Sequence, residues 1–385
     1  MARVLQLVTE LVVGGATLSM LDFAENMADE HEIVIAHGRL DDPANAAARR
    51  ARGRFATYEL PRLARPLVPR EDIAAARAFA ALCRRLRPDL IHTHSSKAGF
   101  IGRVGAGVTS APLLHTIHGW GHTPLDSPQR RRLLINAERL AARRTTKLIA
   151  VSPEVRDEGL ALRIGNPDRY AVIGEPVDMA PRAADFNAAR AAARAQLKLP
   201  PDADVVGWVG RFSPQKDPQV LAEALTRLLD ERHNAYAVLI GDGPDRELVA
   251  QRLREEIRAR RVFMAGERPD VRQLYPAFDV LLHTTLWEGH PRVVREALAE
   301  RVPVVTGRVS GTSVLATDAR LGVQVKPGDV DAYVWAMEMI LGPGGLRAPV
   351  AESALAPLRA VADEPYRSMR ELYDSALAQT RGERG

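Results

Sequence analysis

The feature that most constrains this chain is a regular alternation of strand-like apolar runs with helical stretches over all 385 residues. Such alternation is typical of βαβ units, which build parallel sheets covered by helices. The strands expected in the first half are Val4–Val8, Glu32–Ala36, Leu90–His94, Leu113–Ile117, Leu148–Val151 and Tyr170–Ile173. Those expected in the second half are Val205–Val209, Ala237–Ile240, Val262–Ala265, Val280–His283, Val302–Thr306 and Gly322–Val325. The sequence therefore predicts an α/β protein.

Length and a change of composition predict two domains. The chain is too long for one typical domain and long enough for two, each with its own core. Between Pro181 and Pro201 it becomes rich in Ala and Arg, and a new αβ series follows. We place the domains at residues 1–180 and 181–365, followed by a lone helix over Tyr366–Leu377. Two domains of similar size make the cleft between them the first place to expect a site.

The composition, 46% hydrophobic and 26% charged, is that of a soluble globular protein. No apolar run reaches the about eighteen residues that a membrane span needs, and we recognise no export signal in Met1–Val8. The single cysteine, Cys83, fits a reducing compartment and is expected to pack in the core. A net charge of +5 favours anionic ligands, while 5% aromatic content argues against base stacking. We expect a cytoplasmic protein that does not bind nucleic acid.

One dense basic segment runs from Gln129 to Lys147 and contains a single acidic residue, Glu138. Leucines and other apolar residues alternate with its arginines, which predicts an amphipathic helix. Two interpretations stay open. We favour a solvated helix face; the other interpretation is peripheral docking to anionic lipid at the inner face of a membrane.

The most informative stretch carries two carboxylates, Glu288 and Glu296, on either side of an expected helix start at Pro291. Proline suits an early helical position because its missing N–H costs nothing there. The free N–H groups of a helix start can bind an anion, and carboxylates can accept hydrogen bonds from sugar hydroxyls. One stretch could therefore bind both halves of a nucleotide sugar.

Two further loops follow strands of the second domain. Arg211 and Lys216 lie after Val205–Val209 and could bind phosphate oxygens, although each alone is most simply a surface cation. Gly241 follows Ala237–Ile240 in a Gly-Asp-Gly-Pro turn, which alone indicates only a tight βα connection.

In this order and spacing, the three features resemble the family-four glycosyltransferases of the retaining GT-B type. The resemblance covers nearly the whole chain, including the stretches 14–16, 91–99, 115–121, 149–152 and 266–271. It implies two Rossmann-like domains facing each other across a cleft, with the segment 366–385 crossing back to the first domain. The first domain would bind the acceptor and the second the nucleotide-sugar donor.

The resemblance also implies roles for individual residues. Arg211 and Lys216 would hold the donor diphosphate and stabilise the leaving nucleotide, Glu296 would bind the ribose, and Glu288 would lie beside the transferred sugar. The other donor-side candidates are Gly15, Gly241, Arg268 near the base, and the backbone at Arg292 and Val293. His118 would contact the sugar or the reacting end of the acceptor. The acceptor-side candidates are His94, Lys97, His118, Trp120 and Glu175.

Two segments depart from the family pattern. Glu175 and Pro176 stand where the family commonly has an Asn-Gly turn, so the local hinge geometry and the acceptor chemistry are expected to be particular to this chain. Glu300 and Arg301 replace small uncharged residues, from which we expect only a surface effect.

The function implied by the resemblance is transfer, with retention, of a hexosyl or N-acetylhexosaminyl group from a UDP-sugar such as UDP-GlcNAc or UDP-glucose. The acceptor would be a hydroxyl of a saccharide, a lipid-linked saccharide or a small molecule such as an aminocyclitol, as in polysaccharide or natural-product biosynthesis. Neither a cofactor nor a metal is expected, because cationic side chains would neutralise the diphosphate. The alternative is a nucleotide-sugar epimerase or binding protein of the same architecture.

Other site chemistries fit less well. A glycosidase needs carboxylates about 5–9.5 Å apart, whereas eight residues of helix span about 12 Å, although Glu288 is expected to precede the helix that carries Glu296. A dinucleotide oxidoreductase needs a glycine spacing that does not follow Gly14 and Gly15. Asp202 and Asp204 have the spacing of a metal site but precede a strand, so we interpret them as a solvated turn. A metal cluster of histidines lacks supporting ligands, and packing or substrate contact is preferred for His92, His94, His115, His118 and His122.

Overall fold

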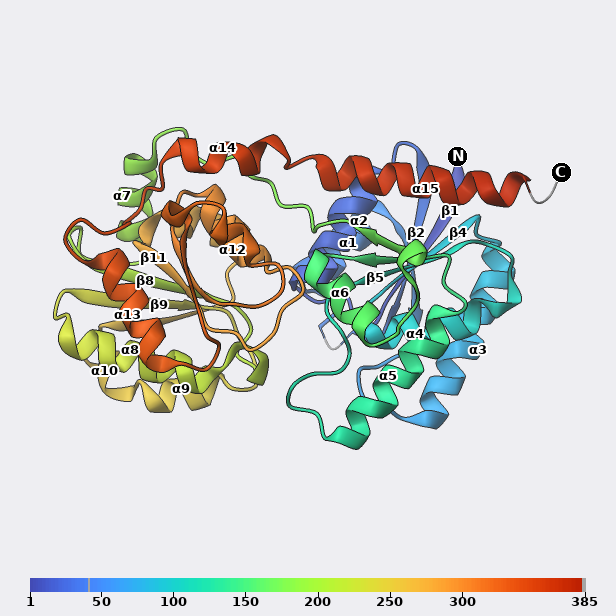
Figure 1. Ribbon diagram of the computed structural model, residues 1–385, viewed down its shortest axis with the longest axis horizontal. Coiled ribbons are helices and arrows are strands. Elements are labelled where there is room, and N and C mark those ends of the chain that lie inside the picture. Colours follow the sequence, from blue (N-terminus) through green and yellow to red (C-terminus); the bar gives the residue numbers. More distant parts are fainter. Residues whose placement is uncertain (41, 383–385) are drawn as a thin grey trace. The chain divides into compact units, whose positions relative to one another are not determined.

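The computed structural model describes residues 1–40 and 42–382, which form two compact α/β units (Figure 1). Unit 1 comprises Met1–Pro176 together with the C-terminal stretch from Asp363, and unit 2 comprises Val177–Ala362. The chain thus leaves unit 1, builds the whole of unit 2, and returns to unit 1 with its last helix.

Unit 1 contains a seven-stranded parallel sheet in the order β3-β2-β1-β4-β5-β6-β7. Its strands are β1(Ala2–Val8), β2(His31–Gly38), β3(Ala56–Leu60), β4(Leu90–His94), β5(Leu113–Ile117), β6(Lys147–Ala150) and β7(Tyr170–Val172). The order proceeds from β1 in one direction to β3 and from β4 in the other direction to β7. The carboxyl ends of β1 and β4 therefore meet at the point where the winding reverses.

Helices cover both faces of this sheet because the strand residues alternate between two cores. Val4 packs with α1(Gly15–Asn26), α2(Ala46–Arg54) and α15(Glu364–Gly382), whereas Leu5 packs with α3(Pro69–Leu86) and α4(Ser96–Gly105). Met369 and Tyr373 of α15 pack in the same core as Val4, so the last helix is part of unit 1 (Figure 1). The other helices of unit 1 are α5(Pro128–Ala142) and α6(Pro153–Ala161).

Unit 2 contains a six-stranded parallel sheet in the order β10-β9-β8-β11-β12-β13. Its strands are β8(Asp204–Val209), β9(Ala235–Ile240), β10(Val262–Gly266), β11(Val280–His283), β12(Val304–Gly307) and β13(Gly322–Val325). Here the winding reverses between β8 and β11, in the same manner as between β1 and β4.

Two cores again flank the sheet. One contains Val206 and the helices α8(Pro218–Glu231), α9(Arg246–Arg252) and α13(Val330–Leu341). The other contains Val205 and the helices α7(Phe186–Gln196), α12(Arg292–Ala299) and α14(Glu352–Ala360). Two short helices, α10(Arg254–Arg258) and α11(Val271–Leu274), complete the set among the described residues. The prediction of two Rossmann-like domains is therefore confirmed.

Each expected strand is present within one or two residues, but β3 was not expected. Its sequence, Ala-Thr-Tyr-Glu-Leu, lacks a continuous apolar run because it is an edge strand with only Leu60 fully buried. Cys83, a residue of α3, is 1% exposed and packs in the core, as expected.

Two acidic residues that were expected at the surface are buried, and both expectations were wrong. Asp204 is the first residue of β8 and binds Arg232 at 2.6 Å and Arg347 at 2.5 Å. Glu300 is 3% exposed, binds Arg272 at 2.6 Å and accepts a hydrogen bond from the backbone N–H of Arg182. Arginines on neighbouring elements supply the opposite charge that allows burial, and a local sequence pattern does not reveal them.

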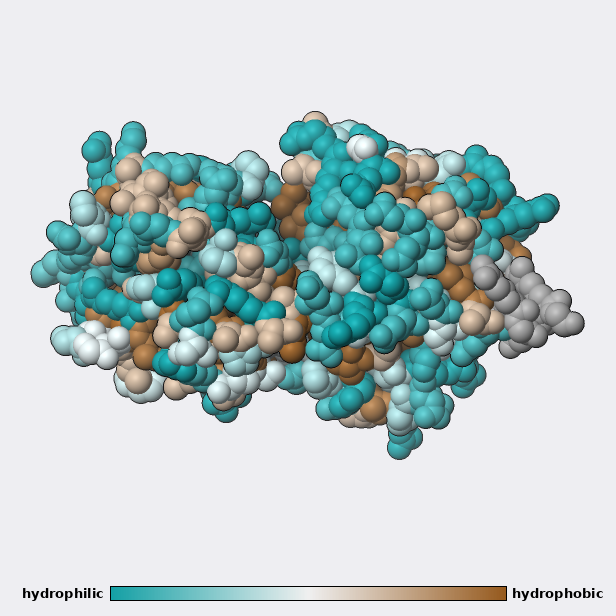
Figure 2. All heavy atoms as spheres, turned by 90° about the horizontal axis from the view of Figure 1, so that it is seen from above, coloured by the Kyte–Doolittle hydropathy of each residue, from teal (hydrophilic) through white to brown (hydrophobic). Residues whose placement is uncertain are grey.

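Hydrophilic side chains cover most of the face shown in Figure 2, with small apolar patches between them. Within residues 1–40 and 42–382, we find no helix that combines the length and the apolar character needed to cross a bilayer.

Candidate functional site

The site in unit 2 lies where the winding of its sheet reverses. In open parallel sheets, ligands bind outside the carboxyl ends of the two strands at such a point. Here the strands are β8 and β11. A short 3-10 helix, η3(Pro214–Lys216), follows β8, and the loop with Glu288 follows β11. The fold thus brings the loops of two of the predicted donor-side residues together.

Lys216, His283 and Glu288 form one cluster at this edge. The Lys216 ammonium donates to a carboxylate oxygen of Glu288 and lies 3.0 Å from Nε2 of His283. Oε1 of Glu288 also accepts a hydrogen bond from Thr285 at 3.3 Å. The Lys216 and Glu288 side chains are 15% and 13% exposed, so the pair is sheltered but still reaches the surface.

The charges in this cluster are fixed at neutral pH. Burial opposes ionisation of Glu288, but the nearby charge of Lys216 outweighs it and lowers the pKa of the carboxyl to about 2. Burial and the same lysine charge lower the pKa of His283 to about 4. The site therefore holds a cation, an anion and a neutral imidazole.

Hydrogen bonds to backbone carbonyls hold the loop after β8 against the loop after β11. The N–H of Leu286 donates to the Gln215 carbonyl at 2.9 Å, and the Gln215 amide donates to the Trp287 carbonyl at 2.8 Å. The Thr284 hydroxyl donates to the Lys216 carbonyl at 2.8 Å. These bonds fix the backbone on either side of the Lys216–Glu288 pair, so the pair does not rely on two flexible loops.

Gly241 allows a third loop to approach. Its φ is +135°, and a Cβ atom there would lie 1.8 Å from the carbonyl oxygen of Gly210. A larger residue would therefore push the loop after β9 away from the loop that carries Arg211. Gly241 acts through backbone geometry, in agreement with a tight βα turn.

Glu296 belongs to a different element and has different partners. It lies on α12, which begins at Arg292 directly after Pro291, so the N–H groups of Arg292 and Val293 belong to the first turn. Oε2 of Glu296 accepts a hydrogen bond from the Tyr275 hydroxyl at 3.2 Å, and Arg292 lies 3.7 Å from Oε1. Tyr275 is fully buried, so its hydroxyl holds the Glu296 carboxylate from the protein interior.

Two other predicted donor-side cations, Arg211 and Arg268, lie in loops after strands of the same sheet. Arg211 lies just after β8 with an exposed side chain. Arg268 makes two bonds of 2.7 and 2.6 Å to Asp270 in its own loop after β10, the edge strand, and these bonds lower the pKa of the aspartate. The structure thus brings Lys216 and Glu288 together and leaves Arg268 in a local pair.

In unit 1 the corresponding edge lies between β1 and β4. The Thr9 and Ser95 hydroxyls, one after each strand, are 2.7 Å apart, and the Thr9 oxygen accepts the N–H of Ala98. Gly15, the first residue of α1, lies exposed at the same edge. Gly15 thus lies in the connection from β1 to α1, and its donor-side role stays a prediction.

Three predicted acceptor-side residues are connected through side-chain hydrogen bonds. Nδ1 of His118 lies 2.7 Å from Oε1 of Glu175, and its Nε2 lies 3.2 Å from Nδ1 of His94. The other oxygen of Glu175 accepts a hydrogen bond from Ser19 on α1 at 2.9 Å. Glu175 therefore ties the end of unit 1 to both His118 and α1.

Lys97 and Trp120 have other partners. Lys97 forms an ion pair with Asp72 on α3 at 2.5 Å and donates to the Pro66 carbonyl. Trp120 is 9% exposed, packs in a small core beside α6, and donates its indole N–H to the Val155 carbonyl at 3.1 Å.

Sequence reasoning missed His283, Ser19 and Gln215. His283 stood inside an expected strand, and its only signal was a polar residue at the carboxyl end of an otherwise apolar run. Ser19 and Gln215 carried no recognisable signal, because their contacts depend on residues 156 and 72 positions away along the chain. Among residues 1–40 and 42–382, no group of three or more histidine, cysteine or acidic side chains is arranged to hold a metal ion.

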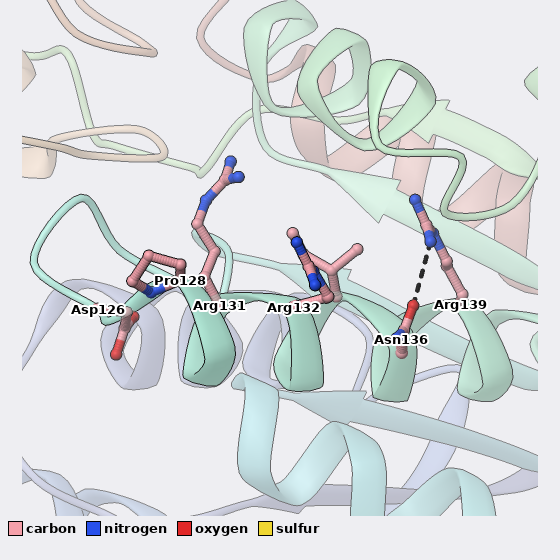
Figure 3. Close-up of a pocket in the computed structure, with 7 residues that line it drawn as sticks. Asp126, Pro128, Arg131, Arg132, Asn136 and Arg139 are labelled. Carbon is pink, nitrogen blue, oxygen red and sulfur yellow. Dashed lines mark hydrogen bonds between the residues drawn. The ribbon is translucent and has the colours of Figure 1, made fainter.

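Most of the basic segment forms α5, which borders a surface cavity of about 570 Å³, whereas Arg143 and Arg144 follow the helix and Lys147 begins β6. Figure 3 shows Arg131 and Arg139 extending from the helix to the same side, with Arg139 bonded to Asn136. Leu133 and Leu140 on this helix are 63% and 60% exposed. The segment thus combines arginines with exposed leucines.

Two family models match the chain. The model described as Glycosyltransferase Family 4 matches residues 13–180, and the model described as Glycosyl transferases group 1 matches residues 189–354.

Individual proteins give the same result. The chain is 26% identical over 284 residues to UDP-Gal:alpha-D-GlcNAc-diphosphoundecaprenol alpha-1,3-galactosyltransferase of Escherichia coli, covering 73% of each chain. It is 30% identical over 308 residues to D-inositol 3-phosphate glycosyltransferase of Streptomyces scabiei, covering 75% of this chain and 68% of that protein. The crystal structure of Anabaena Alr3699/HepE in complex with UDP and glucose superimposes with a TM-score of 0.80 at 21% identity, over 98% of this chain and 100% of that one. With two parallel-sheet units and these matches over both halves, the chain belongs to the family-four glycosyltransferases of GT-B fold.

Proposed function

We propose that this glycosyltransferase transfers a hexosyl or N-acetylhexosaminyl group from a UDP-sugar to an acceptor hydroxyl with retention of configuration. The observation that carries the proposal is the Lys216–Glu288 pair at the reversal point of the unit 2 sheet. A sheltered cation and an ionised carboxylate at that edge fit a ligand with a diphosphate and a sugar.

The chemistry follows from the donor capacity of Lys216. An ammonium has three N–H groups. Among the contacts of the described residues, Lys216 Nζ directs two of them at Glu288 and His283. The third can bind a phosphate oxygen and stabilise the negative charge that develops on the leaving UDP. With Arg211 and the first N–H groups of α12 as further partners, the diphosphate needs no divalent metal.

The names of the relatives support the choice of substrates. The Escherichia coli relative is named for a UDP-galactose donor and a diphosphoundecaprenol-linked sugar acceptor, and the Anabaena structure contains UDP and glucose. The Streptomyces relative is named for an inositol phosphate acceptor. We propose a UDP-hexose or UDP-N-acetylhexosamine donor, with a saccharide, a lipid-linked saccharide or a small cyclitol-like molecule as acceptor.

The acceptor side is assigned to His118 and its neighbours. Glu175 and His94 hold both ring nitrogens of His118, which fixes the orientation of the imidazole. To bind a hydroxyl of the sugar or acceptor, His118 would exchange its longer contact, the 3.2 Å one to His94, for that hydroxyl while Glu175 keeps the ring oriented. Orientation of this kind contributes to transfer without a covalent nucleophile.

We further propose that α5 binds anionic lipid. Its arginines attract acidic headgroups, and the exposed side chains of Leu133 and Leu140 can enter the interface. This contact would bring the enzyme to a lipid-linked acceptor.

Kinetics with a panel of nucleotide sugars tests the donor assignment. The variant Lys216→Ala should lose at least about tenfold in kcat/KM, or about 1.4 kcal/mol of transition-state stabilisation. Arg258→Ala is the matched control, because that arginine is a 67%-exposed cation on α10 of the same unit. Equal kinetics of Lys216→Ala and wild type would remove the donor site from this edge.

The products separate the remaining possibilities. The anomeric configuration, followed by NMR, should be retained, and EDTA should leave the activity unchanged. An epimerised nucleotide sugar, or binding without turnover, would instead identify an epimerase or a binding protein.

A further inference from the structure

The inference concerns His283, the last residue of β11, and rests on the proposed role of Lys216 as the diphosphate ligand. His283 is 1% exposed, and both of its ring nitrogens have partners. Nε2 lies 3.0 Å from the Lys216 ammonium, and Nδ1 lies 2.8 Å from the Thr306 hydroxyl. No feature of the family resemblance assigns a role to either residue.

The directions of these hydrogen bonds follow from the chemistry of the partners. An ammonium can only donate, so Nε2 must accept from Lys216. A neutral imidazole that accepts at Nε2 carries its hydrogen at Nδ1, and this hydrogen is donated to Thr306. The Thr306 hydroxyl in turn donates to the Gly307 carbonyl at 3.3 Å. Each hydrogen bond in the series from Lys216 through His283 and Thr306 to the Gly307 carbonyl therefore has one direction.

Glu288 does not compete for His283. Its Oε1 lies 3.6 Å from Nε2, which is too long for a hydrogen bond, whereas Lys216 is within bonding distance. Because the ring is buried beside an ammonium, its pKa is lowered to about 4 and it stays neutral at pH 7. It can therefore accept from Lys216 without adding a charge that would repel it.

The backbone fixes this arrangement before any ligand binds. His283 and Thr306 are paired residues in the register of β11 and β12, so the hydroxyl faces the ring across the sheet. Thr306 is fully buried, and its hydroxyl lies between the His283 ring and the Gly307 carbonyl. Residues at the carboxyl ends of two adjacent strands thus support a lysine that lies on a loop.

We propose that His283, held as its Nδ1–H tautomer by Thr306, is a positioning residue for Lys216. His283 accepts one N–H of the Lys216 ammonium and Glu288 accepts another, so that the third N–H points at the donor diphosphate. Without this acceptor, Lys216 would turn to Glu288 alone, and the carboxylate would compete with the diphosphate for it. Removing the Thr306 hydroxyl would free the ring to adopt the opposite tautomer, whose Nε2–H would face the ammonium.

NMR of the ligand-free protein tests the tautomer directly. In a two-bond proton–nitrogen spectrum of protein labelled with ¹⁵N-histidine, His283 should show a protonated Nδ1 and an unprotonated Nε2; the His283→Gln spectrum supplies the assignment. Thr306→Ser should keep this pattern and Thr306→Val should lose it. A protonated Nε2 in the wild type would overturn the proposal whatever the enzyme's substrate.

Calorimetric titration of UDP tests the positioning effect. Lys216→Ala should weaken UDP binding about tenfold, and His283→Leu should weaken it at least about threefold. His283→Gln, which keeps an acceptor, should recover most of the affinity. In the Lys216→Ala background, His283→Leu should add no further loss, because the group that it positions is gone.

The outcomes separate the inference from the proposed function. If Lys216→Ala binds UDP like the wild type, the donor site itself is misplaced. If Lys216→Ala is weakened while folded His283→Leu and Thr306→Val bind like the wild type, the donor site stands and the positioning role of His283 is refuted.

Discussion

Glu288 and Glu296 are the same residue type eight positions apart, but their surroundings differ. Glu288 follows a strand and shares a charged cluster with Lys216. Glu296 lies on a helix and accepts a hydrogen bond from the buried Tyr275. Different partners lead to different expectations for the two carboxylates.

Calorimetry with UDP should distinguish them. UDP has a ribose but no transferred sugar, so Glu296→Gln should weaken its binding by about tenfold, as expected for a lost charge-assisted hydrogen bond. Glu288→Gln should not weaken UDP binding, because Lys216 keeps its charge; instead it should lower kcat with a UDP-sugar. The control is Glu255→Gln, since that carboxylate is 78% exposed on α10. A loss of UDP affinity only in Glu288→Gln would reverse the two roles.

The sequence allowed some residues of the site to be predicted and not others. Lys216 and Glu288 could be predicted because each lies in a loop just after an apolar strand, and parallel strands bring such loops to one edge. The bond between His283 and Thr306 could not, because it depends on the register of β11 against β12. The buried ion pairs of Asp204 and Glu300 could not be predicted either, because their arginine partners lie on other elements of the fold.

At the scale of elements, α5 is distinguished by its exposed surface. Its N-terminus is capped by Ser127, and Ile135 and Ala141 face inward, which leaves most of its arginines and two leucines outside. Exposed leucines beside a row of arginines give α5 the composition of a helix that can lie in a membrane interface.

Co-sedimentation with liposomes tests this element. Wild-type protein should bind vesicles that contain anionic lipid and should be released by salt, because the attraction is electrostatic. Changing Arg130, Arg131 and Arg132 to Glu should abolish sedimentation while leaving UDP binding unchanged. Equal sedimentation of the two proteins, or binding to neutral vesicles alone, would exclude the lipid contact.

Elements were predicted best where they are buried on both sides. The interior strands β4, β5 and β11 have the bounds that their apolar runs indicate, and the half-buried edge strand β13 is an exception that was also predicted with its observed bounds. β3 was missed because an edge strand needs only one apolar residue, and α7 was not separated from the Ala/Arg-rich stretch that contains it. A strand that is buried on both faces leaves a continuous apolar run in the sequence, whereas a partly buried element leaves a weaker pattern.

At the scale of the whole molecule, several histidines are buried in neutral form. Burial lowers the pKa of His92 to about 3 and holds those of His94 and His115 well below the usual value, and that of His283 is lowered to about 4. The unfolded chain takes up protons at these positions below about pH 6.5, whereas the folded protein does not. The stability that these neutral histidines contribute is therefore fully present above about pH 6.5 and is lost as the pH falls below it.

Scanning calorimetry should show this loss between pH 7.5 and 5.5. Each such histidine costs about 1.4 kcal/mol per pH unit below 6.5 until its folded pKa is reached. The loss should be larger in the transition of unit 1, which contains His92, His94 and His115, than in that of unit 2. A midpoint that does not change over this range would contradict the neutral burial of these side chains.

The return of the chain to unit 1 has a consequence for synthesis on the ribosome. Unit 2 is continuous in sequence, so all of its strands have emerged before α15 is made. Unit 1 must wait, because Met369 and Tyr373 of α15 close its core and the Tyr373 hydroxyl lies 2.7 Å from Nδ1 of His92. Although unit 1 begins the chain, we expect it to be completed last, and a nascent chain stalled before α15 would expose an unfinished apolar face to chaperones.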